Sequence, residues 1–585
     1  MPSEQLSRRS KAPMPVTNPD GSDPRTLQEL WVALARARRS TYLGVDTNGR
    51  LTFGKPDEPV SNIGPSRAGK TTGIFVPAVA CFPGPAIVAS IRSDLRDDTL
   101  AARKLLAATH GGSVMELDFT GNLPVVSKRI YWDPLKGAES WNVAMKRADL
   151  FAELTITDHQ SSHWGSRAAD FLAPLMHAAA LQGEDALGLM RSLQLDEETL
   201  ARYKATLAES PSFHALSTFD GVMEHGRAAE EERSSIRSTA EQIFRCFKLD
   251  RPAGVDWATW WSNWDLDEFF TTPSTIYITV PMDEEKTLRP AIVAFIDLIY
   301  KGWEAAKLRL PNRQPSVMFA LDEAAHISPV PYLPRYMTAG GGDGVVPVVG
   351  LQDTSQTVRS WGPTGVLLYR GVHRCIFPGL DDNTYLKEIV GNLPSKVQHD
   401  SAVEIRDADL GREEGVAGRH RLRSEREAVE SRVRQFPGDE EGYQWEETCY
   451  DLAGKRIDDN LRIRRKYLIQ ADDDPVKALQ AELEDLTYIK DRTDWRPDVK
   501  VSDIVSPPDG HVYRKSGEET TLTRVEPWFD HPRLGPMLQH ARETVRERER
   551  TGQLMSGPTT PLPHPEGGLW NRGHDPGGDI GLTGL

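Results

Sequence analysis

A glycine-rich loop near the N-terminus constrains the fold of this chain more than any other feature. Residues Gly64 to Thr71 read Gly-Pro-Ser-Arg-Ala-Gly-Lys-Thr and fit the pattern G-x-x-x-x-G-K-[ST]. Loops of this kind join a β-strand to a helix and turn successive backbone N–H groups toward a phosphate chain. The flanks agree, because EPVSNI before the loop predicts a strand and TTGIFVPAVA after it predicts the start of a helix. The sequence therefore predicts a nucleotide-binding P-loop.

The residue types of the loop suggest how a nucleotide would be held. Gly64 and Gly69 are expected to permit the tight turn, Lys70 to reach the β- and γ-phosphates, and the Thr71 hydroxyl to ligate Mg²⁺. The positive N-terminal end of the following helix favours the same anion. We expect ATP and Mg²⁺ as cofactors. The predicted nucleotide-binding residues are Gly64, Pro65, Ser66, Arg67, Ala68, Gly69, Lys70, Thr71 and Thr72.

A second segment, VMFALDEAAH, supplies the acidic half of an ATPase site. Val317 to Leu321 form a continuous apolar run that predicts a buried strand, and Asp322 and Glu323 follow at its carboxyl end. Ligands bind at that end of the strands in open α/β sheets. We expect Asp322 to hold Mg²⁺ together with Thr71, and Glu323 to orient and activate the attacking water. The alternative, a strand end with two solvated acids, is disfavoured by the P-loop upstream.

The segment VVPVVGLQDTSQ predicts another strand with a glutamine at its tip. Gln352 is expected to contact the γ-phosphate and respond to its loss, and Gln356 follows one helical turn later. Either amide could instead cap a helix. The predicted catalytic residues are therefore Lys70, Glu323 and Gln352.

Composition sets broad limits on the chain. Its 585 residues are enough for two or more domains, and the net charge is −15. This charge argues against a uniformly basic surface, but it leaves room for a local basic channel for nucleic acid. The four cysteines have no C-x-x-C spacing, so neither a zinc site nor a disulfide framework is indicated. No apolar signal segment precedes residue 40, and we expect a cytoplasmic protein.

Strand and helix patterns alternate along much of the chain. PAIVASI, DDTLAARKLLAATH and SVMELDF follow the P-loop with the βαβ rhythm of a parallel sheet. Residues 150–250 are helix-periodic and contain no convincing strand, which indicates an all-α insertion. The segment 25–40 predicts an amphipathic helix, interpreted as docking on the core rather than as attachment to a membrane partner.

Three segments together resemble a known family: GPSRAGKTT, the region MFALDEAAH to TVRSWG, and CIFPGLDDNTYLKEIVG. They look like the TraG/TraD-type coupling proteins of conjugative and type IV secretion systems, in the style of the actinobacterial branch. The stretch from Leu321 is similar to the segment named in that family as the TraM-recognition region. The resemblance covers roughly residues 45–400, together with PPDGHVYR and TRVEPWFDHPRL near the C-terminus.

The resemblance implies a RecA-like hexameric ATPase whose α/β core, with a parallel β-sheet, carries an inserted all-α domain. Such proteins recruit a relaxase–DNA complex to the secretion channel and drive transfer of single-stranded DNA. The expected divisions are a disordered N-terminus with a docking helix (1–40), the first core part (41–149), the all-α insertion (150–265), the second core part (266–400), a charged insertion (401–500), a C-terminal part of the core (501–545) and a disordered tail (546–585).

The sequence departs from the family in two respects. The family usually begins with a transmembrane pair, which is missing here, so the resemblance implies recruitment by a separate membrane-anchor protein. Many relatives also carry an arginine that acts on the neighbouring subunit's nucleotide, and that position falls on Gly341. Arg335, Arg370 or Arg374 would have to substitute, or hydrolysis would be slow.

Contacts with DNA are less defined. The segment WATWWSNW places Trp257, Trp260, Trp261 and Trp264 on one helical face, which predicts a packed seam more strongly than a base-stacking surface. Two rival functions share the P-loop. One is an FtsK-like DNA-translocating or helicase-type ATPase unconnected to secretion, and the other is a docking module that binds nucleotide without hydrolysing it.

Overall fold

The structure is a computed structural model. It describes residues 14–38, 41–46, 49–119, 127–155, 162–193, 197–223, 230–247, 264–280, 283–370, 373–391, 395–398, 494–497, 501–516, 519–552 and 562–563. The chain divides into two compact units, Met1–Asp381 with Ser506–Leu585, and Asp382–Val505.

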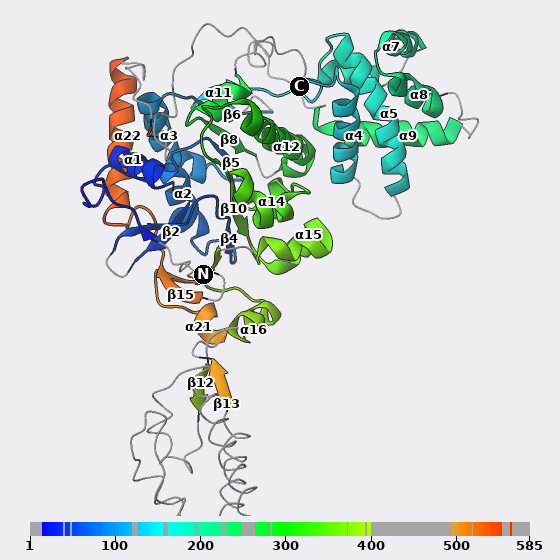
Figure 1. Ribbon diagram of the computed structural model, residues 1–585. Helices are drawn as coiled ribbons and strands as arrows, with labels where there is room; N and C mark the ends of the chain where they lie inside the picture. Colours follow the sequence, from blue (N-terminus) through cyan, green and yellow to red (C-terminus); the bar gives the residue numbers. More distant parts are fainter. Residues whose placement is uncertain are drawn as a thin grey trace, which may run out of the picture. The chain divides into compact units, whose positions relative to one another are not determined.

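The first unit is built on a sheet of 13 strands, shown edge-on in the middle of Figure 1. Its central part is parallel. In sheet order the parallel strands are β11 (His373–Ile376), β4 (Val60–Ile63), β10 (Val345–Leu351), β9 (Val317–Leu321), β5 (Ala86–Ser90), β8 (Thr275–Thr279), β6 (Val114–Leu117) and β7 (Lys128–Ile130). The predicted fold class, an α/β core with a parallel sheet and an all-α insertion, is confirmed.

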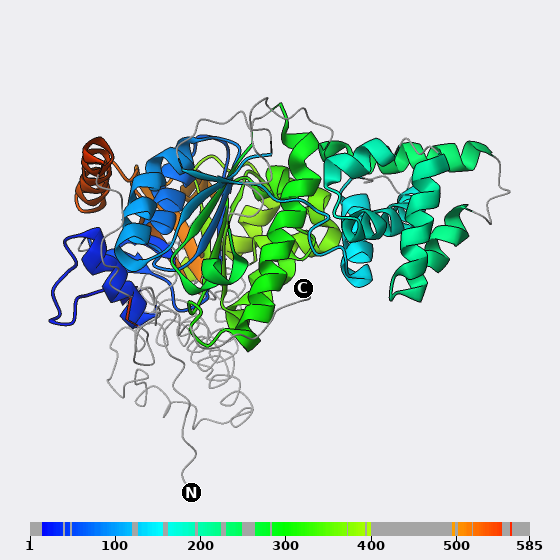
Figure 2. The ribbon, with the colours of Figure 1, turned by 90° about the horizontal axis from the view of Figure 1, so that it is seen from above.

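Helices cover both faces of this sheet (Figures 1 and 2). On one face lie α2 (Val76–Cys81) and α3 (Asp94–His110), and on the other α12 (Glu285–Arg309) and α14 (Leu333–Ala339). Strands between two helical layers must be apolar on both sides, which explains why β5, β9 and β10 are buried along their whole length and rich in Val, Ile, Leu and Ala.

The parallel sheet is extended by antiparallel strands that the sequence analysis did not predict. Beyond β11 follow β14 (His511–Ser516), β15 (Glu519–Arg524), β2 (Tyr42–Val45), β3 (Leu51–Phe53) and β1 (Met14–Pro15). The sheet is therefore parallel in its centre and antiparallel at this edge. The assignment of Met14 and Pro15 to a disordered N-terminus is wrong, since they pair with Phe53 and Thr52. The pairing of β15 with β2 joins Arg524 to Val45, and a pairing of segments so far apart in the sequence leaves no local pattern in either of them.

The N-terminal helix α1 (Leu27–Ala37) packs on the core, as its docking interpretation predicts. Leu30, Trp31 and Leu34 are buried, and the Trp31 indole N–H donates to the carbonyl of Ala80 at 2.9 Å. The C-terminal helix α22 (Leu534–Thr551) packs against α3, where Arg542 pairs with Asp98. Helices α1 and α22 thus lie on the same face of the sheet as α2 and α3 (Figure 1).

The helical insertion lies between β7 and β8 in the sequence. Its helices are α4 (Trp141–Thr155), α5 (Ser162–Leu181), α6 (Ala186–Ser192), α7 (Glu197–Glu209), α8 (Phe213–Met223) and α9 (Glu230–Ile243). Helix α5 is central and contacts each of the others. In the core of the insertion, the rings of Phe151 and Phe244 meet edge to face with their centroids 5.7 Å apart. Helix α4 packs on α12, which covers the sheet. A short helix, α11 (Leu266–Thr271), precedes β8.

The second unit contains α16 (Asn383–Gly391), α21 (Val501–Val505) and the antiparallel pair β12 (Ser395–Gln398) and β13 (Asp494–Pro497). It begins before the predicted charged insertion at 401 and ends after 500. The basic blocks at 419–426 and 462–466, Trp257, Trp260 and Trp261, and most of the predicted tail lie outside the described residues.

Candidate nucleotide site

The P-loop joins β4 to a helix at the carboxyl edge of the parallel strands. The first turn after the loop, Thr71–Phe75, is π-helical and continues directly into α2. Ile74, Phe75 and Val76 anchor this junction in the core. The N-terminal end of this helical segment therefore faces the loop and carries the partial positive charge that attracts phosphate.

The two glycines of the motif are needed for different reasons. Gly69 has φ +90°, a conformation that side chains disfavour, and so it provides the expected turn. Gly64 does not have a positive φ, but a Cβ there would lie 2.5 Å from the Cβ of Phe377. Close packing against Phe377, the residue after β11, therefore explains the glycine at position 64, and its expected part in the turn stays a prediction.

The Lys70 side chain is held inside the loop. Its Nζ donates to the carbonyls of Gly64 at 2.5 Å and Pro65 at 2.8 Å, and only 6% of the residue is exposed. Burial lowers the pKa of Lys70, while the carboxylates of Asp322 and Glu323 act in the opposite direction. A buried ammonium group among carbonyls is well placed to exchange these contacts for phosphate oxygens.

Thr71, after the P-loop, and Asp322, after β9, contact each other at the carboxyl edge of the sheet, as two ligands of one metal ion would have to. The Thr71 hydroxyl donates to Oδ2 of Asp322 at 2.8 Å, joining residues 251 positions apart. Burial raises the pKa of Asp322 to about 6, although the Thr71 hydrogen bond lowers it. A buried carboxylate beside a hydroxyl is an oxygen donor set that suits Mg²⁺ with phosphates as further ligands.

Glu323 begins helix α13 (Ala324–Ile327) in a left-handed conformation, with φ 58° and ψ 47°. A non-glycine residue in this region costs about 1–3 kcal/mol, and such strain is concentrated at functional sites. Gly350 of the neighbouring β10 allows this turn, because a Cβ there would lie 2.8 Å from Asp322 Oδ1 and 3.1 Å from the Glu323 backbone nitrogen.

Gln352 lies behind Glu323 rather than in the nucleotide cavity. Its Nε2 donates to Glu323 Oε1 at 3.2 Å, and its Oε1 accepts from Nε2 of Gln356 at 3.2 Å. The side-chain cap of α15 (Thr354–Trp361) is Asp353, so the structure does not support the alternative that either glutamine side chain is the N-cap. The predicted direct contact of Gln352 with the γ-phosphate stays a prediction.

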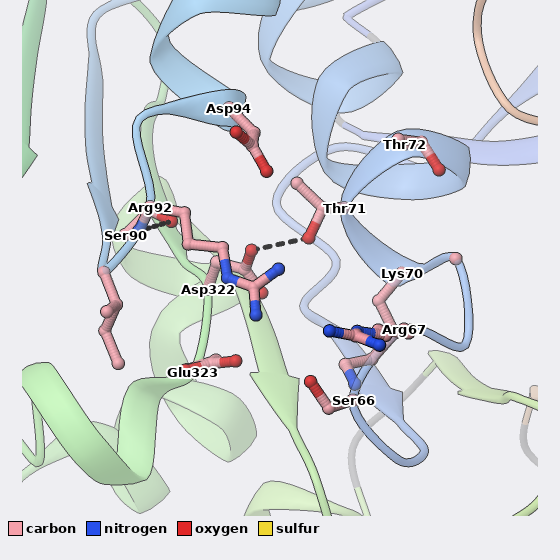
Figure 3. A pocket seen from close by; sticks show the side chains of 12 residues that line it. Ser66, Arg67, Lys70, Thr71, Thr72, Ser90, Arg92, Asp94, Asp322 and Glu323 are labelled. Carbon is pink, nitrogen blue, oxygen red and sulfur yellow. Dashed lines mark hydrogen bonds between the residues drawn. The ribbon is translucent and has the colours of Figure 1, made fainter. Parts of the chain in front are cut away.

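The cavity itself holds about 230 Å³ between the P-loop and the ends of β5 and β9 (Figure 3). Among the predicted residues it is lined by Ser66, Arg67, Gly69, Lys70, Thr71, Thr72, Asp322 and Glu323. Gly64, Pro65, Ala68 and Gln352 are not among its lining residues.

The sequence analysis missed three polar residues of this cavity: Ser90, Arg92 and Asp94. Ser90 ends β5, and Arg92 and Asp94 come directly after this strand, which pairs with β9 so that Ala89 lies opposite Leu321. Figure 3 shows the Arg92 guanidinium pointing into the cavity beside Asp322. The sequence could have predicted these residues, because SIRSD comes at the end of an apolar strand. The carboxyl ends of parallel strands share one edge of the sheet, where the nucleotide was expected.

Comparisons with known proteins were made with this geometry in hand. The model of the family "Type IV secretory system Conjugative DNA transfer" matches residues 26–407, more than half of the 585 residues. The chain belongs to this family. It is a coupling protein of the TraG/TraD type with a P-loop, and it acts in conjugative DNA transfer through type IV secretion.

Solved structures give more distant similarities. The conjugative coupling protein TrwBΔN70 is 14% identical, with 63% of this chain and 81% of that chain covered and a TM-score of 0.43. TrwB in complex with ADP and Mg²⁺ is 16% identical over 61% and 78% of the two chains, with a TM-score of 0.42. VirB4 of Thermoanaerobacter pseudethanolicus is 12% identical over 60% and 87%, with a TM-score of 0.34. A search of curated proteins found no match.

Membership of the conjugative DNA transfer family directs attention to two expectations from the sequence. In the part of the chain that the structure describes, no helix is both long and apolar enough to cross a bilayer. Gly341 lies in the short 3-10 segment Gly340–Asp343, and Arg335, Arg370 and Arg374 do not line the described nucleotide cavity. An arginine from a neighbouring subunit therefore stays a prediction.

The raised pKa of Asp322 predicts how the free energy of unfolding of this protein changes with pH. A carboxyl whose folded-state pKa exceeds its unfolded value loses stability as pH rises, here between about pH 4 and 6, and the whole loss is present at neutral pH. Asp322→Asn keeps an acceptor for Thr71 but has no charge to bury. We expect it to stabilise the nucleotide-free protein by up to about 3 kcal/mol at neutral pH, and to abolish Mg²⁺-dependent nucleotide binding.

Denaturant unfolding of both proteins without Mg²⁺, near pH 4 and near pH 7.5, measures the effect. The difference between variant and wild type should be present only at the higher pH. An equal difference at both values would mean that the Asp322 carboxylate does not cost stability in the fold.

Proposed function

We propose that the chain hydrolyses ATP with Mg²⁺ and uses the energy to drive single-stranded DNA, delivered as a relaxase complex, into a type IV secretion channel. The observation that carries this proposal is the convergence of Lys70, Thr71, Asp322 and Glu323 in one cavity. A pure docking module would need the P-loop but would have no use for a strained glutamate beside it. We further propose a homo-hexamer, recruited by a separate membrane-anchor protein.

The residues of the cavity would divide the work. Lys70 and the N–H groups of the loop would bind the β- and γ-phosphates, and Thr71 and Asp322 would hold Mg²⁺. The metal, when bound, neutralises charge between the β- and γ-phosphates. Glu323 would accept a proton from the attacking water, with Gln352 fixing its carboxylate through the 3.2 Å hydrogen bond.

An ATPase assay with and without single-stranded DNA, together with a mass measurement of the assembly, tests the proposal. Turnover that rises with DNA in an assembled ring supports the transfer motor. ATP binding without turnover, by a confirmed assembly, would favour the docking module. Co-purification with a relaxase would favour coupling, whereas association with the chromosome would favour the FtsK-like alternative.

We propose that Arg92 supplies positive charge at the γ-phosphate from within the same subunit. It lines the cavity, and its side chain makes no hydrogen bond or ion pair with the described residues; only its backbone N–H donates, to Ser90 Oγ at 3.3 Å. Lys70 comes from the P-loop and Arg92 from the loop after β5, so the two side chains would reach a bound phosphate from different elements (Figure 3). An unpaired guanidinium can form two parallel bonds to phosphate oxygens.

Arg92→Ala should lower the rate constant for hydrolysis by about 10²- to 10³-fold while ADP affinity changes little, because the lost charge faces the transferred phosphate. Arg92→Lys should recover part of the rate. Single-turnover hydrolysis and ADP titration measure the two effects. Arg67→Ala is the matched comparison, since Arg67 lines the same cavity. An equal loss of rate in both variants would contradict a specific role for Arg92.

A further inference from the structure

A second, larger cavity lies next to the residues that position Glu323. It holds about 630 Å³ and is formed by α4, α12, α13, α15 and the connections around them. His326 and Gln356 line it, and both belong to the hydrogen-bonded chain that ends at Glu323. This cavity plays no part in the function proposed above.

The cavity is lined with more positive than negative charge. Lys286, Arg289 and Arg359 face it, against the single carboxylate of Glu153. Burial, and then the charge of Asp149, raise the pKa of Glu153 above its usual range. Lys286 and Arg359 are exposed and form no ion pair or hydrogen bond with other described residues. Both are therefore available to an anion.

Arg289 is held differently from the other two cations. Its Nη2 bonds Glu285 Oε1 at 2.7 Å, and the same oxygen lies 3.9 Å from His326 Nδ1. That second distance is beyond a hydrogen bond. The Glu285 carboxylate therefore pairs with Arg289 and only lies near His326. If an anion bound Arg289, the carboxylate of Glu285 would be free to accept a hydrogen bond from the His326 imidazole.

From His326 a continuous chain of side chains leads to the nucleotide cavity. Gln356 Nε2 lies 3.2 Å from His326 Nε2 and 3.2 Å from Gln352 Oε1, and Gln352 Nε2 lies 3.2 Å from Glu323 Oε1. The two N–H groups of one amide can serve His326 and Gln352 together only if His326 Nε2 accepts, which places the ring proton on Nδ1. Glu285 beside Nδ1 would stabilise that tautomer.

We propose that this cavity binds a phosphate ester and that the chain His326–Gln356–Gln352 transmits its occupancy to Glu323. The inference rests on the proposed function, in which Glu323 activates water. Phosphate on Lys286, Arg289 and Arg359 releases Glu285 to His326 Nδ1. His326 with its proton on Nδ1 then accepts from Gln356, and the side chains of Gln356 and Gln352 fix the position of the Glu323 carboxylate. Occupancy therefore accelerates hydrolysis. The ester comes either from the backbone of a single strand or from a free nucleotide.

The cavity is tested with the full-length protein and the paired variant Lys286→Ala with Arg359→Ala. The probes are a fluorescent oligothymidylate of about 20 nucleotides and thymidine monophosphate. The matched control is Arg36→Ala with Arg546→Ala, two exposed arginines on α1 and α22 that remove the same charge from the opposite face of the sheet. We expect the oligothymidylate to bind the cavity variant about tenfold more weakly, with the control unchanged.

The ratio of ATP turnover with and without probe measures the coupling. We expect it to exceed one in wild type and the control, and to fall to about one in the cavity variant and in His326→Ala. His326→Ala should still bind the oligothymidylate, and His326→Gln should restore part of the ratio because an amide oxygen can accept from Gln356. A merely structural role for His326 would reduce binding and turnover together.

The outcomes separate the two proposals. Stimulation by oligothymidylate alone identifies a strand as the source, and stimulation by thymidine monophosphate identifies a free ester. Wild-type affinity and ratio in the cavity variant would overturn the cavity, and a wild-type ratio in His326→Ala would overturn the coupling. Absence of turnover in wild type itself would instead refute the proposed function. The affinities of wild type, cavity variant and control for the oligothymidylate would still decide whether the cavity binds phosphate.

Discussion

Lys70→Ala is expected to abolish ATP turnover and to weaken ATP binding by at least about 100-fold. Lys70 is buried, with only 6% of the residue exposed. Its ammonium group donates to two carbonyls of the P-loop, so the loop is shaped to hold a positive charge. Alanine leaves the phosphates without this charge inside a site with three carboxylates, Asp94, Asp322 and Glu323. Removing it also strengthens the net repulsion between those carboxylates and the nucleotide, which Arg67 and Arg92 then offset alone.

Isothermal titration with ATP and a phosphate-release assay measure the two losses. Lys104→Ala is the matched control, because Lys104 on α3 removes the same charge outside the cavity, where it pairs with Glu549. It should retain wild-type turnover. Turnover in Lys70→Ala close to that of Lys104→Ala would remove the ATPase interpretation altogether.

Glu323→Gln is expected to lower hydrolysis by about 10³-fold or more while ATP affinity stays near that of wild type. Glutamine has the same size, tolerates the left-handed backbone no worse than glutamate, and keeps an oxygen that can accept from Gln352. It lacks only the basic carboxylate. Nucleotide binding should persist, since it depends on Lys70, Thr71 and Asp322.

Single-turnover kinetics with an independent binding measurement separate these effects. Asp94→Asn provides a control from the same cavity, because it removes a carboxylate from the opposite side without altering the Asp322–Thr71 bond. Its loss of rate should be far smaller. A collapse of ATP affinity in Glu323→Gln would show that Glu323 supports the fold of the site and does not activate water.

The proposed role of Arg92 also bears on the arginine that the family resemblance leads us to expect at the position of Gly341. If Arg92 acts within the subunit, hydrolysis does not need a residue from a neighbour, and isolated protomers should retain part of the turnover. The cavity beside His326 would then provide control that assembly does not. Arg92 follows β5 and Gln352 follows β10, and these two strands flank β9, which leads to Asp322. Both proposed controls of hydrolysis therefore act from the strands next to β9.

The sequence by itself determined the phosphate-binding half of the site. A P-loop is contiguous, so the spacing of Gly69, Lys70 and Thr71 fixes its geometry locally, and the apolar run before Asp322 fixes a buried strand that ends in an acid. The βαβ rhythm and the strand-free stretch of helices were likewise local patterns, and they were enough for the fold class.

Only the tertiary structure decided how distant segments meet. Asp322 reaches Thr71, and Arg92 enters the cavity, because β5 and β10 lie on either side of β9, an order that no segment encodes alone. The same holds for Gly64, which is required by Phe377, and for the strands that bring residues 14–15 and 511–524 to one sheet edge. Local periodicity reports burial of a segment, whereas strand order and cross-sheet contacts depend on which buried surfaces pack together, and that is set by the whole chain at once.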